Sequence, residues 1–280
     1  MPFRVMTWNV WWRFGDWQRR EPAIVETIRT QTPDVVCLQE TWAWRHDPDT
    51  DEVGEHQAHR LAERLGWNVA VNEPLWFGER AFSNAVLSPW PLERVLDEIL
   101  PREDGSRGHR RVLGARVSTP WGPWPVVSTH LDHFFDGSAG REHHARLLLE
   151  MVSTVRGDPK VDLPVVLGAD LNAVPDSDEV RLLTGRRAGG PPGVIMSDAW
   201  ELVGEGSGST WRHDNPHVTH SAWPNRRVDY VMVSWPRPRP AGNPLSTWLA
   251  ATEPVDLGDG PVWASDHAAV VADLNTPDHR

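Results

Sequence analysis

Apolar residues along this chain fall into short strand-like runs, and a few longer amphipathic stretches separate some of them. The clearest helical pattern covers residues 139–156, where Ala145, Leu148 and Val152 share one face and Ser138 precedes them as a candidate cap. Three more helices are predicted at 16–31, 55–66 and 177–185. Strands are predicted at 3–9, 34–39, 68–72, 83–88, 111–118, 124–130, 163–169, 227–234 and 268–274, with a weaker candidate at 245–250.

The connections between these elements indicate how they assemble. Several neighbouring strands have no helix between them, which favours antiparallel or mixed sheets in an α/β fold over a purely parallel sheet. The polar stretch 101–110 is predicted to be a mobile loop. No long Gly/Ser linker interrupts the chain, so residues 1–280 are predicted to form one domain. Proline and glycine mark further loops at 88–91, 119–125, 185–193, 204–208 and 236–244.

Composition restricts the partners of the protein. The chain has 28 Lys plus Arg against 39 Asp plus Glu, a formal net charge of -11 and a pI near 5.6. Such a charge argues against a protein that holds nucleic acid mainly through a basic surface. It leaves open a protein that grips a few phosphates through a bound cation, because the cation supplies the local positive charge. The only cysteine, Cys37, lies in an apolar run and is predicted to be a small buried side chain rather than a nucleophile.

Neither a targeting signal nor a membrane segment is evident in the sequence. Residues 3–10 alternate like a strand, which leaves no room for a secretory signal. No apolar segment approaches the roughly 20 residues that a helix needs to cross a bilayer. We therefore expect a soluble cytoplasmic protein, and we expect it to be a monomer.

Polar residues suited to metal and acid–base chemistry stand at the ends of the predicted strands. Carboxylate and amide oxygens are ligands for a hard cation such as Mg²⁺, and histidines beside such a site can transfer protons. These residues are Asn9, Glu40, His130, Asp170, Asn172, Asp229, Asp266 and His267.

Two of these motifs combine acidic and amide side chains. Asp170 and Asn172 flank one residue at a strand end, so alternation places both on the same side, where they can orient a water or a phosphate oxygen. The same pair also fits a turn and a helix cap before Pro175. Glu40 could be a magnesium ligand or a solvated residue at the end of a strand. Asn9 could donate a hydrogen bond to a phosphate oxygen, contact the metal or its water, or form a turn.

The histidines suit proton transfer or hydrogen bonding to a phosphoryl oxygen. Asp229 is the natural partner to orient His267, because an adjacent carboxylate determines which ring nitrogen carries the proton. A zinc site is a minor alternative, because residues His130 to His133 resemble the zinc-binding motif HxHxDH only loosely.

Taken in order, these motifs resemble those of the endonuclease/exonuclease/phosphatase superfamily. The likeness runs from residue 3 to about residue 274, and it implies a four-layer α/β sandwich of two packed mixed β-sheets flanked by helices. The strand Ser83–Ser88 resembles the family string GNAILS, and Ser138–Arg141 resembles the SAxR start of its long helix, which makes Asn84 and Arg141 candidate substrate-binding residues. The matching strings are Thr7-Trp8-Asn9, Leu38-Gln39-Glu40, Thr129-His130-Leu131, Gly168-Ala169-Asp170-Leu171-Asn172, Arg227-Val228-Asp229-Tyr230 and Ser265-Asp266-His267.

The resemblance implies a role for each motif residue. Glu40 would be the principal Mg²⁺ or Mn²⁺ ligand, with Asn9 and Asp266 close to the metal or its waters. Asp170 would position or deprotonate the attacking water, and Asn172 would hold the phosphate. His267, oriented by Asp229, would contact the scissile phosphate. His130 would contact it too or protonate the leaving oxygen.

Departures from the family narrow the substrate. Abasic-site endonucleases carry an acidic residue where this chain has Trp11 and a tyrosine where it has His130, which argues against that kind of DNA repair. Most of the 17 tryptophans are predicted to be core residues, whereas Trp11, Trp42 or Trp76 could stack against a base.

The sequence therefore predicts a metal-dependent phosphodiesterase or phosphatase. A nucleic acid or nucleotide is favoured as the phosphate-ester substrate over a lipid headgroup, as in sphingomyelinases, or an inositol phosphate. A non-catalytic binding module on the same fold is the alternative of another class, and the intact set of site residues argues against it.

Overall fold

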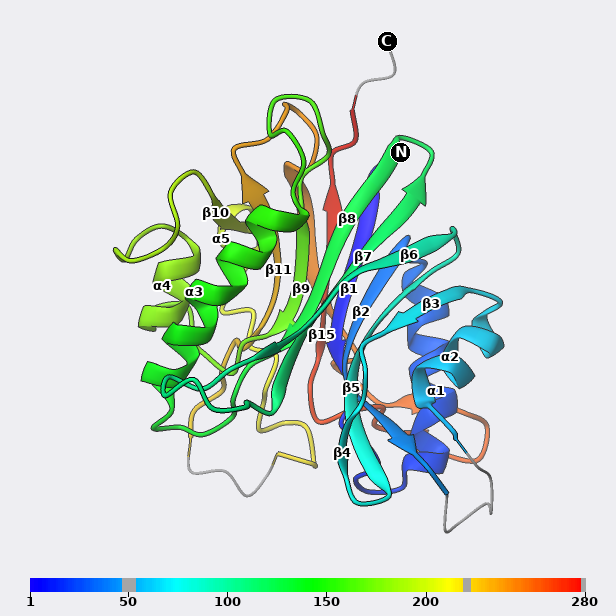
Figure 1. Ribbon diagram of the computed structural model, residues 1–280. Coiled ribbons are helices and arrows are strands. Elements are labelled where there is room, and N and C mark those ends of the chain that lie inside the picture. Colours follow the sequence, from blue (N-terminus) through cyan, green and yellow to red (C-terminus); the bar gives the residue numbers. More distant parts are fainter. Residues whose placement is uncertain (47–53, 219–222, 278–280) are drawn as a thin grey trace.

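Two β-sheets packed face to face form the centre of the protein (Figure 1), in a computed structural model that describes residues 1–46, 54–218 and 223–277. The first sheet has the order β12-β15-β1-β2-β5-β3, with β4 paired to β5. Its strands are β1 (Phe3–Asn9), β2 (Val35–Trp44), β3 (Asn68–Val71), β4 (Leu75–Phe77), β5 (Arg80–Ser88), β12 (Pro244–Ala250) and β15 (Ala269–Leu274).

The second sheet has the order β10-β11-β9-β8-β7-β6. The strands β13 (Val255–Asp256) and β14 (Pro261–Val262) form a separate small hairpin. In the described residues β1 pairs in parallel with β2, and β8 with β9, whereas the other pairs in both large sheets are antiparallel, so the prediction of mixed sheets is confirmed. The strands of the second sheet are β6 (Leu92–Leu100), β7 (Arg110–Thr119), β8 (Gly122–His130), β9 (Val166–Asp170), β10 (Ile195–Asp198) and β11 (Asp229–Trp235).

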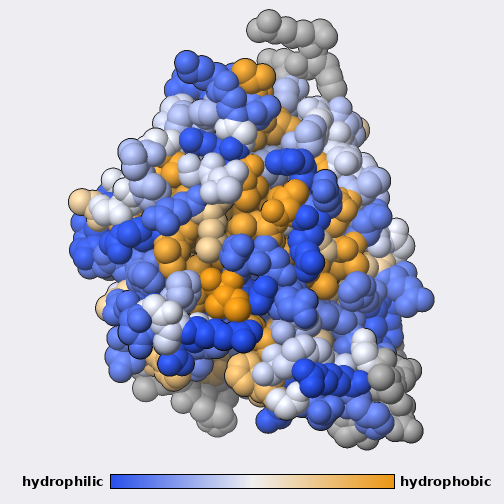
Figure 2. All heavy atoms as spheres, in the orientation of Figure 1, coloured by the Kyte–Doolittle hydropathy of each residue, from blue (hydrophilic) through white to orange (hydrophobic). Residues whose placement is uncertain are grey.

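Helices cover the outer faces of both sheets and complete the four layers. The helices α1 (Trp17–Gln31) and α2 (Gln57–Leu65) pack on the first sheet, and α3 (Ser138–Val155) and α4 (Asp178–Leu183) pack on the second (Figure 1). The short α5 (Ala199–Val203) contacts β11 and β12. Figure 2 shows the face of the molecule that is turned to the viewer in Figure 1. Apolar side chains gather in the middle of this face, between flanks that are mostly hydrophilic. No helix in the described ranges is long and apolar enough to span a membrane.

The two sheets approach closely where Gly168 of β9 faces Cys37 of β2. A methyl group at Gly168 would lie 2.5 Å from Cys37 Cβ and 3.1 Å from Thr7 Cβ. Cys37 is fully buried in the core between the sheets, and burial raises the pKa of its thiol to about 12. The sequence prediction of a buried, unreactive cysteine is therefore confirmed.

Several elements differ from the sequence prediction. Ser138 is not the cap of α3: it is the first helical residue, and its hydroxyl donates to Glu179 Oε2 at 2.7 Å, while Gly137 takes the cap position. The strands β4, β6 and β10 were not predicted, because β4 and β10 are short and the sequence of β6, rich in Glu, Asp and Arg, does not alternate cleanly. The weaker candidate at 245–250 is a real strand, β12.

Candidate active site

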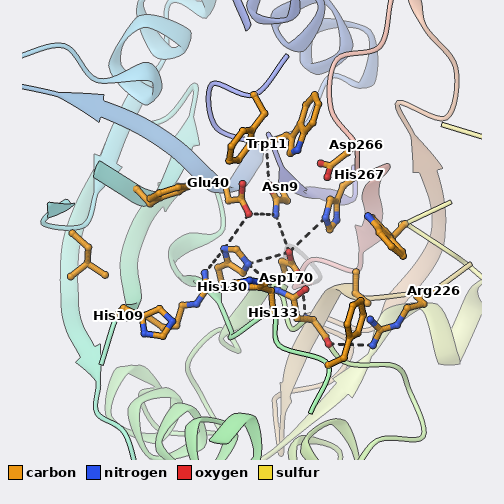
Figure 3. A pocket seen from close by; sticks show the side chains of 18 of the residues that line it. Asn9, Trp11, Glu40, His109, His130, His133, Asp170, Arg226, Asp266 and His267 are labelled. Carbon is orange, nitrogen blue, oxygen red and sulfur yellow. Dashed lines mark hydrogen bonds and ion pairs between the residues drawn. The ribbon is translucent and has the colours of Figure 1, made fainter. Parts of the chain in front are cut away.

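The carboxyl ends of β1, β2, β8 and β9 point to the same edge of the sandwich, at the bottom of Figure 1. A pocket of about 460 Å³ opens at this edge. It is lined by seven of the eight strand-end residues expected to form the site (Figure 3), which are Asn9, Glu40, His130, Asp170, Asn172, Asp266 and His267. The two pairs of parallel strands bring Asn9, Glu40, His130 and Asp170 to this edge. The antiparallel strand β15 begins at the same edge, which adds Asp266 and His267, more than 250 residues after Asn9 in the sequence.

A β-bulge directs Glu40 toward the pocket. In the pairing of β2 with β5, Gln39 and Glu40 both stand opposite the single residue Asn84. Glu40 has a φ of 55°, a left-handed conformation that few residues other than glycine adopt. Bulges of this kind re-aim a side chain next to an active site, and here the carboxylate of Glu40 meets the Asn9 amide at 3.2 Å.

Asp170 lies at the centre of the site. Its Oδ2 accepts a hydrogen bond from the Asn9 amide at 2.9 Å, and its Oδ1 accepts one from the backbone N–H of Asn172 at 2.9 Å. Burial raises the pKa of Asp170 to about 7, and the nearby charge of Asp229 adds to this effect. Asp170 therefore has the proton affinity of a general base near neutral pH.

His267 forms a buried pair with Asp229. The Nδ1 of His267 lies 2.8 Å from Asp229 Oδ2, and the Asp229 side chain is fully buried behind the pocket. Burial by itself lowers the pKa of His267, but the charges of Asp229 and Asp266 outweigh it and hold that pKa well above its ordinary value. The prediction that Asp229 orients His267 matches this geometry, with Nε2 left to face the pocket.

His130 has different partners. Its Nδ1 lies 3.0 Å from the guanidinium of Arg110, and its Nε2 lies 2.9 Å from the Asn172 amide nitrogen and 3.4 Å from Asp170 Oδ2. Burial lowers the pKa of His130, and the charge of Arg110 lowers it further. The two histidines therefore stand in opposite electrostatic environments.

Oxygen ligands gather on one side of the pocket. Glu40, Asn9 and Asp266 line it together, and burial raises the pKa of Asp266 to about 6, with the Glu40 charge adding to the shift. A cation among these groups would offset their mutual repulsion. The carboxylates of Asp170 and Asp229 and the His267 ring form a second group, with ligand atoms within 4.8 Å of one another.

Arginine residues that the sequence reasoning missed hold this site in place. Arg20, buried in α1, donates to five backbone carbonyls, of which those of Val10, Trp11, Trp12 and Phe14 belong to the loop after β1. The sequence gives little sign of this burial, because Arg20 stands between Arg19 and Glu21 in the polar first part of the helix. Arg110 follows the polar stretch 101–109 at the start of β7, and its position before a strand is the only sequence signal for it.

Two predicted substrate-binding residues are buried away from the pocket. Trp42 is fully buried in a cluster with Trp12 and Trp17, so it has no free face for a base. Arg141 is 3% exposed and pairs with Glu179 at 2.6 Å, and it also donates to the carbonyl of Asp132. Both predictions are corrected: the alternation of β2 turns Trp42 inward, and Arg141 stabilises the loop that precedes α3.

The other candidates lie at or near the pocket. Trp11 lines it, with its ring 4.4 Å from that of His217. Asn84 is buried beside Glu40 and His130, and its amide donates to the carbonyl of Arg111 at 2.9 Å. Trp76 lies on β4 with its ring 4.7 Å from the Arg45 guanidinium, and it does not line the pocket.

An aromatic wall that the sequence reasoning missed borders the pocket. Phe135 and Trp223, 50% and 46% exposed, stack with ring centroids 4.7 Å apart. The guanidinium of Arg226 lies 5.2 Å from the Phe135 ring and 5.8 Å from that of Trp223. Phe135 and Arg226 line the pocket itself, so exposed aromatic rings and a cation stand beside Asp170 and Asn172.

This fold and this site define a metal-dependent phosphoric ester hydrolase: carboxylate and amide side chains and histidines share one pocket at the edge of two packed sheets, with Asp229 buried behind His267. A model of the Endonuclease/Exonuclease/phosphatase family matches residues 6–267, and the chain belongs to this family.

Solved structures with the same fold span nearly the whole chain. A D. rerio TDP2 structure, complexed with single strand DNA product, has a TM-score of 0.71 at 21% identity, covering 98% of this chain and 99% of that one. The human Nocturnin catalytic domain with bound sulfate anion has a TM-score of 0.68 at 19% identity, covering 99% and 94%. An endonuclease/exonuclease/phosphatase from Beutenbergia cavernae DSM 12333 has a TM-score of 0.69 at 25% identity, covering 98% and 71%. A comparison with curated proteins found no match.

Proposed function

We propose that this protein hydrolyses a phosphodiester of a nucleic acid or nucleotide, by direct attack of a water molecule activated at Asp170. The observation that carries the proposal is the position of Asp170, hydrogen-bonded to Asn9 and flanked by His130 and His267, whose Nε2 atoms lie 3.4 Å and 4.0 Å from its Oδ2. A base at this point can take a proton from water while the two rings face the phosphoryl oxygens.

The residues present fit a hard divalent cation. Glu40 and Asp266 offer carboxylate oxygens on one wall of the pocket, and Mg²⁺ or Mn²⁺ prefers carboxylate oxygens together with water and substrate phosphate. Asn9 lies beside them, but its Oδ1 accepts the Trp11 N–H at 2.9 Å and its amide nitrogen donates to Glu40, so Asn9 suits a contact to the metal's water better than a direct ligand. Asp170, Asp229 and His267 suit a metal less well, because His267 Nδ1 is engaged with Asp229 and Asp229 does not line the pocket. When bound beside Glu40, the cation would neutralise charge on the phosphoryl group and on the leaving oxygen.

Each remaining residue has a distinct part in the proposal. His267, held protonated by Asp229, donates from Nε2 to a phosphoryl oxygen, where developing negative charge strengthens the hydrogen bond. Asn172 is anchored by its own backbone to Asp170, and in this proposal its amide contacts the phosphate bound beside Asp170. Asn9 orients both Asp170 and Glu40 through one amide group. No covalent intermediate is required.

The aromatic wall supports a substrate with a base. Phe135 and Trp223 present half-exposed rings, and base–aromatic stacking contributes about 1–3 kcal/mol per base. Arg226 adds a positive charge that can contact a backbone phosphate. The D. rerio TDP2 structure, complexed with single strand DNA product, also supports a nucleic-acid substrate for this protein. Trp11, on the opposite wall, remains a predicted contact for a substrate base or sugar.

A turnover panel with Mg²⁺ and with Mn²⁺ tests the substrate class. The substrates are plasmid DNA, single-stranded DNA and RNA, an abasic oligonucleotide, sphingomyelin and inositol phosphates. We expect single-stranded nucleic acid to be hydrolysed and a chelator to abolish the activity. Preferential hydrolysis of sphingomyelin or an inositol phosphate would replace the nucleic-acid assignment. Binding without turnover of any substrate would indicate a non-catalytic module, and metal analysis that finds zinc would support a different hydrolase.

Substitution of Asp170 tests the mechanism. Asp170→Asn keeps the size of the side chain and removes the base, so we expect a loss of about 10²–10⁴-fold in kcat. His267→Ala should lower kcat as well. Asp176→Asn, at an exposed position of the same segment, is the matched control and should leave activity unchanged. Full activity in Asp170→Asn would contradict the proposed mechanism.

A further inference from the structure

Arg110 is the first residue of β7, and its guanidinium reaches the pocket between two histidines. One terminal nitrogen lies 3.0 Å from His130 Nδ1, and the other lies 3.2 Å from His133 Nδ1. The same nitrogen that meets His133 lies 3.6 Å from Asp132 Oδ1. The side chain of Arg110 is only 14% exposed, and its contact with His130 is shielded from solvent, whereas His133 is exposed.

Hydrogen-bond chemistry assigns the proton of His130. A guanidinium has only N–H donors and stays charged, so an imidazole nitrogen that meets it must accept. The Nδ1 of His130 therefore carries no proton, and the single proton of the ring is on Nε2. From there it points toward Asp170 Oδ2, an acceptor 3.4 Å away (Figure 3).

Asn172 competes with Arg110 for this ring. The Asn172 amide nitrogen lies 2.9 Å from His130 Nε2, and it also donates to the carbonyl of Leu131 at 3.1 Å. It cannot donate to Nε2 while Arg110 donates to Nδ1, because the ring would then hold no proton. Hydrogen bonds from a charged donor are about twice as strong as neutral ones, so the Arg110 contact decides the tautomer. Without Arg110, Asn172 would favour a proton on Nδ1, the atom 3.9 Å from Glu40 Oε1.

We propose that Arg110 is a positioning residue that holds His130 with its proton on Nε2, so that His130 donates a hydrogen bond to a phosphoryl oxygen and does not deliver a proton to the leaving group. The inference rests on the proposed function and deepens it, because it gives His130 and His267 different roles. A carboxylate orients His267 and a guanidinium orients His130. A ring in the Nε2–H form that gave up its only proton would become an imidazolate, which excludes His130 as the general acid.

Nitrogen-15 NMR of histidine-labelled protein reads the tautomer directly, without any substrate. The His130 signals are assigned by their loss in His130→Gln. In the wild-type protein we expect a protonated Nε2 and an unprotonated Nδ1. In Arg110→Met we expect the proton to move to Nδ1, and in Arg110→Lys, which keeps a charged donor, we expect the wild-type pattern. A proton on Nδ1 in the wild-type protein overturns the inference, even if Arg110→Met does not fold.

Kinetics on the best substrate of the panel give the second readout. Arg110→Met should lower kcat about 10²-fold, the size of effect seen when one preorganised donor to a transition-state oxygen is lost. Arg110→Lys should recover most of that loss. Arg107→Met, an equal loss of charge in the exposed loop before β7, should leave kcat and the NMR pattern unchanged. Wild-type kcat in Arg110→Met would overturn the inference, whereas inactivity of the wild-type protein on every substrate would count against the proposed function alone.

Discussion

Four residues around the pocket adopt left-handed backbone conformations although none is glycine. They are Trp11, Trp12, Glu40 and Asn172, with φ values of 57°, 38°, 55° and 50°. Such conformations cost roughly 1–3 kcal/mol each and persist where the surroundings enforce them. Arg20 enforces two of them, because its guanidinium binds the carbonyls of Trp11 and Trp12 at 2.9 Å and 2.8 Å. Backbone strain is therefore concentrated at the residues that direct side chains into the pocket.

A buried histidine that does not line the pocket makes folding stability depend on pH. His56 accepts a hydrogen bond from the backbone of Ala58 on Nδ1, and its Nε2 lies 2.7 Å from Ser83 Oγ. Burial lowers its pKa to about 3, and the nearby His59 adds to the shift. The unfolded chain therefore binds a proton between about pH 6.5 and pH 3 that the folded chain does not bind, so stability falls as the pH falls through this range.

We expect His56 to cost about 2 kcal/mol of unfolding free energy between about pH 6.5 and pH 5. Urea unfolding at both pH values measures the change. His56→Asn keeps a good helix cap for α2 but does not titrate, so its stability should fall less over the same range. Equal pH dependence in the two proteins would show that His56 is not the group responsible.

At the scale of elements, the long helix and most strands were predictable from local pattern. The predicted 139–156 and the observed α3 nearly coincide, because Ala145, Leu148 and Val152 stand at helical spacing on its buried face. The strands that carry the motifs were also predicted, since each is an apolar run with a polar motif residue at one of its two ends. The strands β4 and β10 were missed because three or four residues are too short to show a period.

The contact between β9 and β2 sets the distance between the two sheets, and it offers a second test. Gly168→Ala places a methyl group 2.5 Å from Cys37 Cβ, so we expect a loss of about 1–3 kcal/mol in unfolding free energy. Gly140→Ala in α3 is the control, because a methyl group there meets no atom within 4 Å and alanine favours the helix by about 0.5–1 kcal/mol. Denaturant unfolding should separate the two variants in opposite directions. A Gly168→Ala protein as stable as wild type would show that the sheets can move apart without cost.

At the scale of the whole molecule, a net charge of -11 limits how the protein can hold nucleic acid. The positive groups at the pocket are few, chiefly Arg110 and Arg226, so contact with about two phosphates is expected. Each phosphate neutralised on a single strand contributes about -0.7 to the slope of log affinity against log salt. Binding should then come mainly from stacking and from the metal site.

We therefore expect a shallow slope of about -1 to -2 for single-stranded DNA bound to Asp170→Asn protein. Affinity is measured by fluorescence anisotropy over a series of salt concentrations. Arg226→Gln should make the slope shallower by about 0.7. A slope steeper than about -4 would reveal an extended basic surface and contradict this account.

The sequence by itself determined the mixed α/β architecture, the family resemblance and the order of polar residues at strand ends. Alternation and apolar runs are local properties, so they can be recognised in the sequence without the fold. Only the tertiary structure decided which of these residues share a pocket and which lie beside it. Trp42 and Arg141 have the right chemistry, but packing of α1 and α4 against them leaves no exposed face. Arg110 belongs to none of the recognised sequence motifs, yet the antiparallel pairing of β7 and β8 places it against His130. Contacts between neighbouring strands depend on register and burial, which no single element encodes.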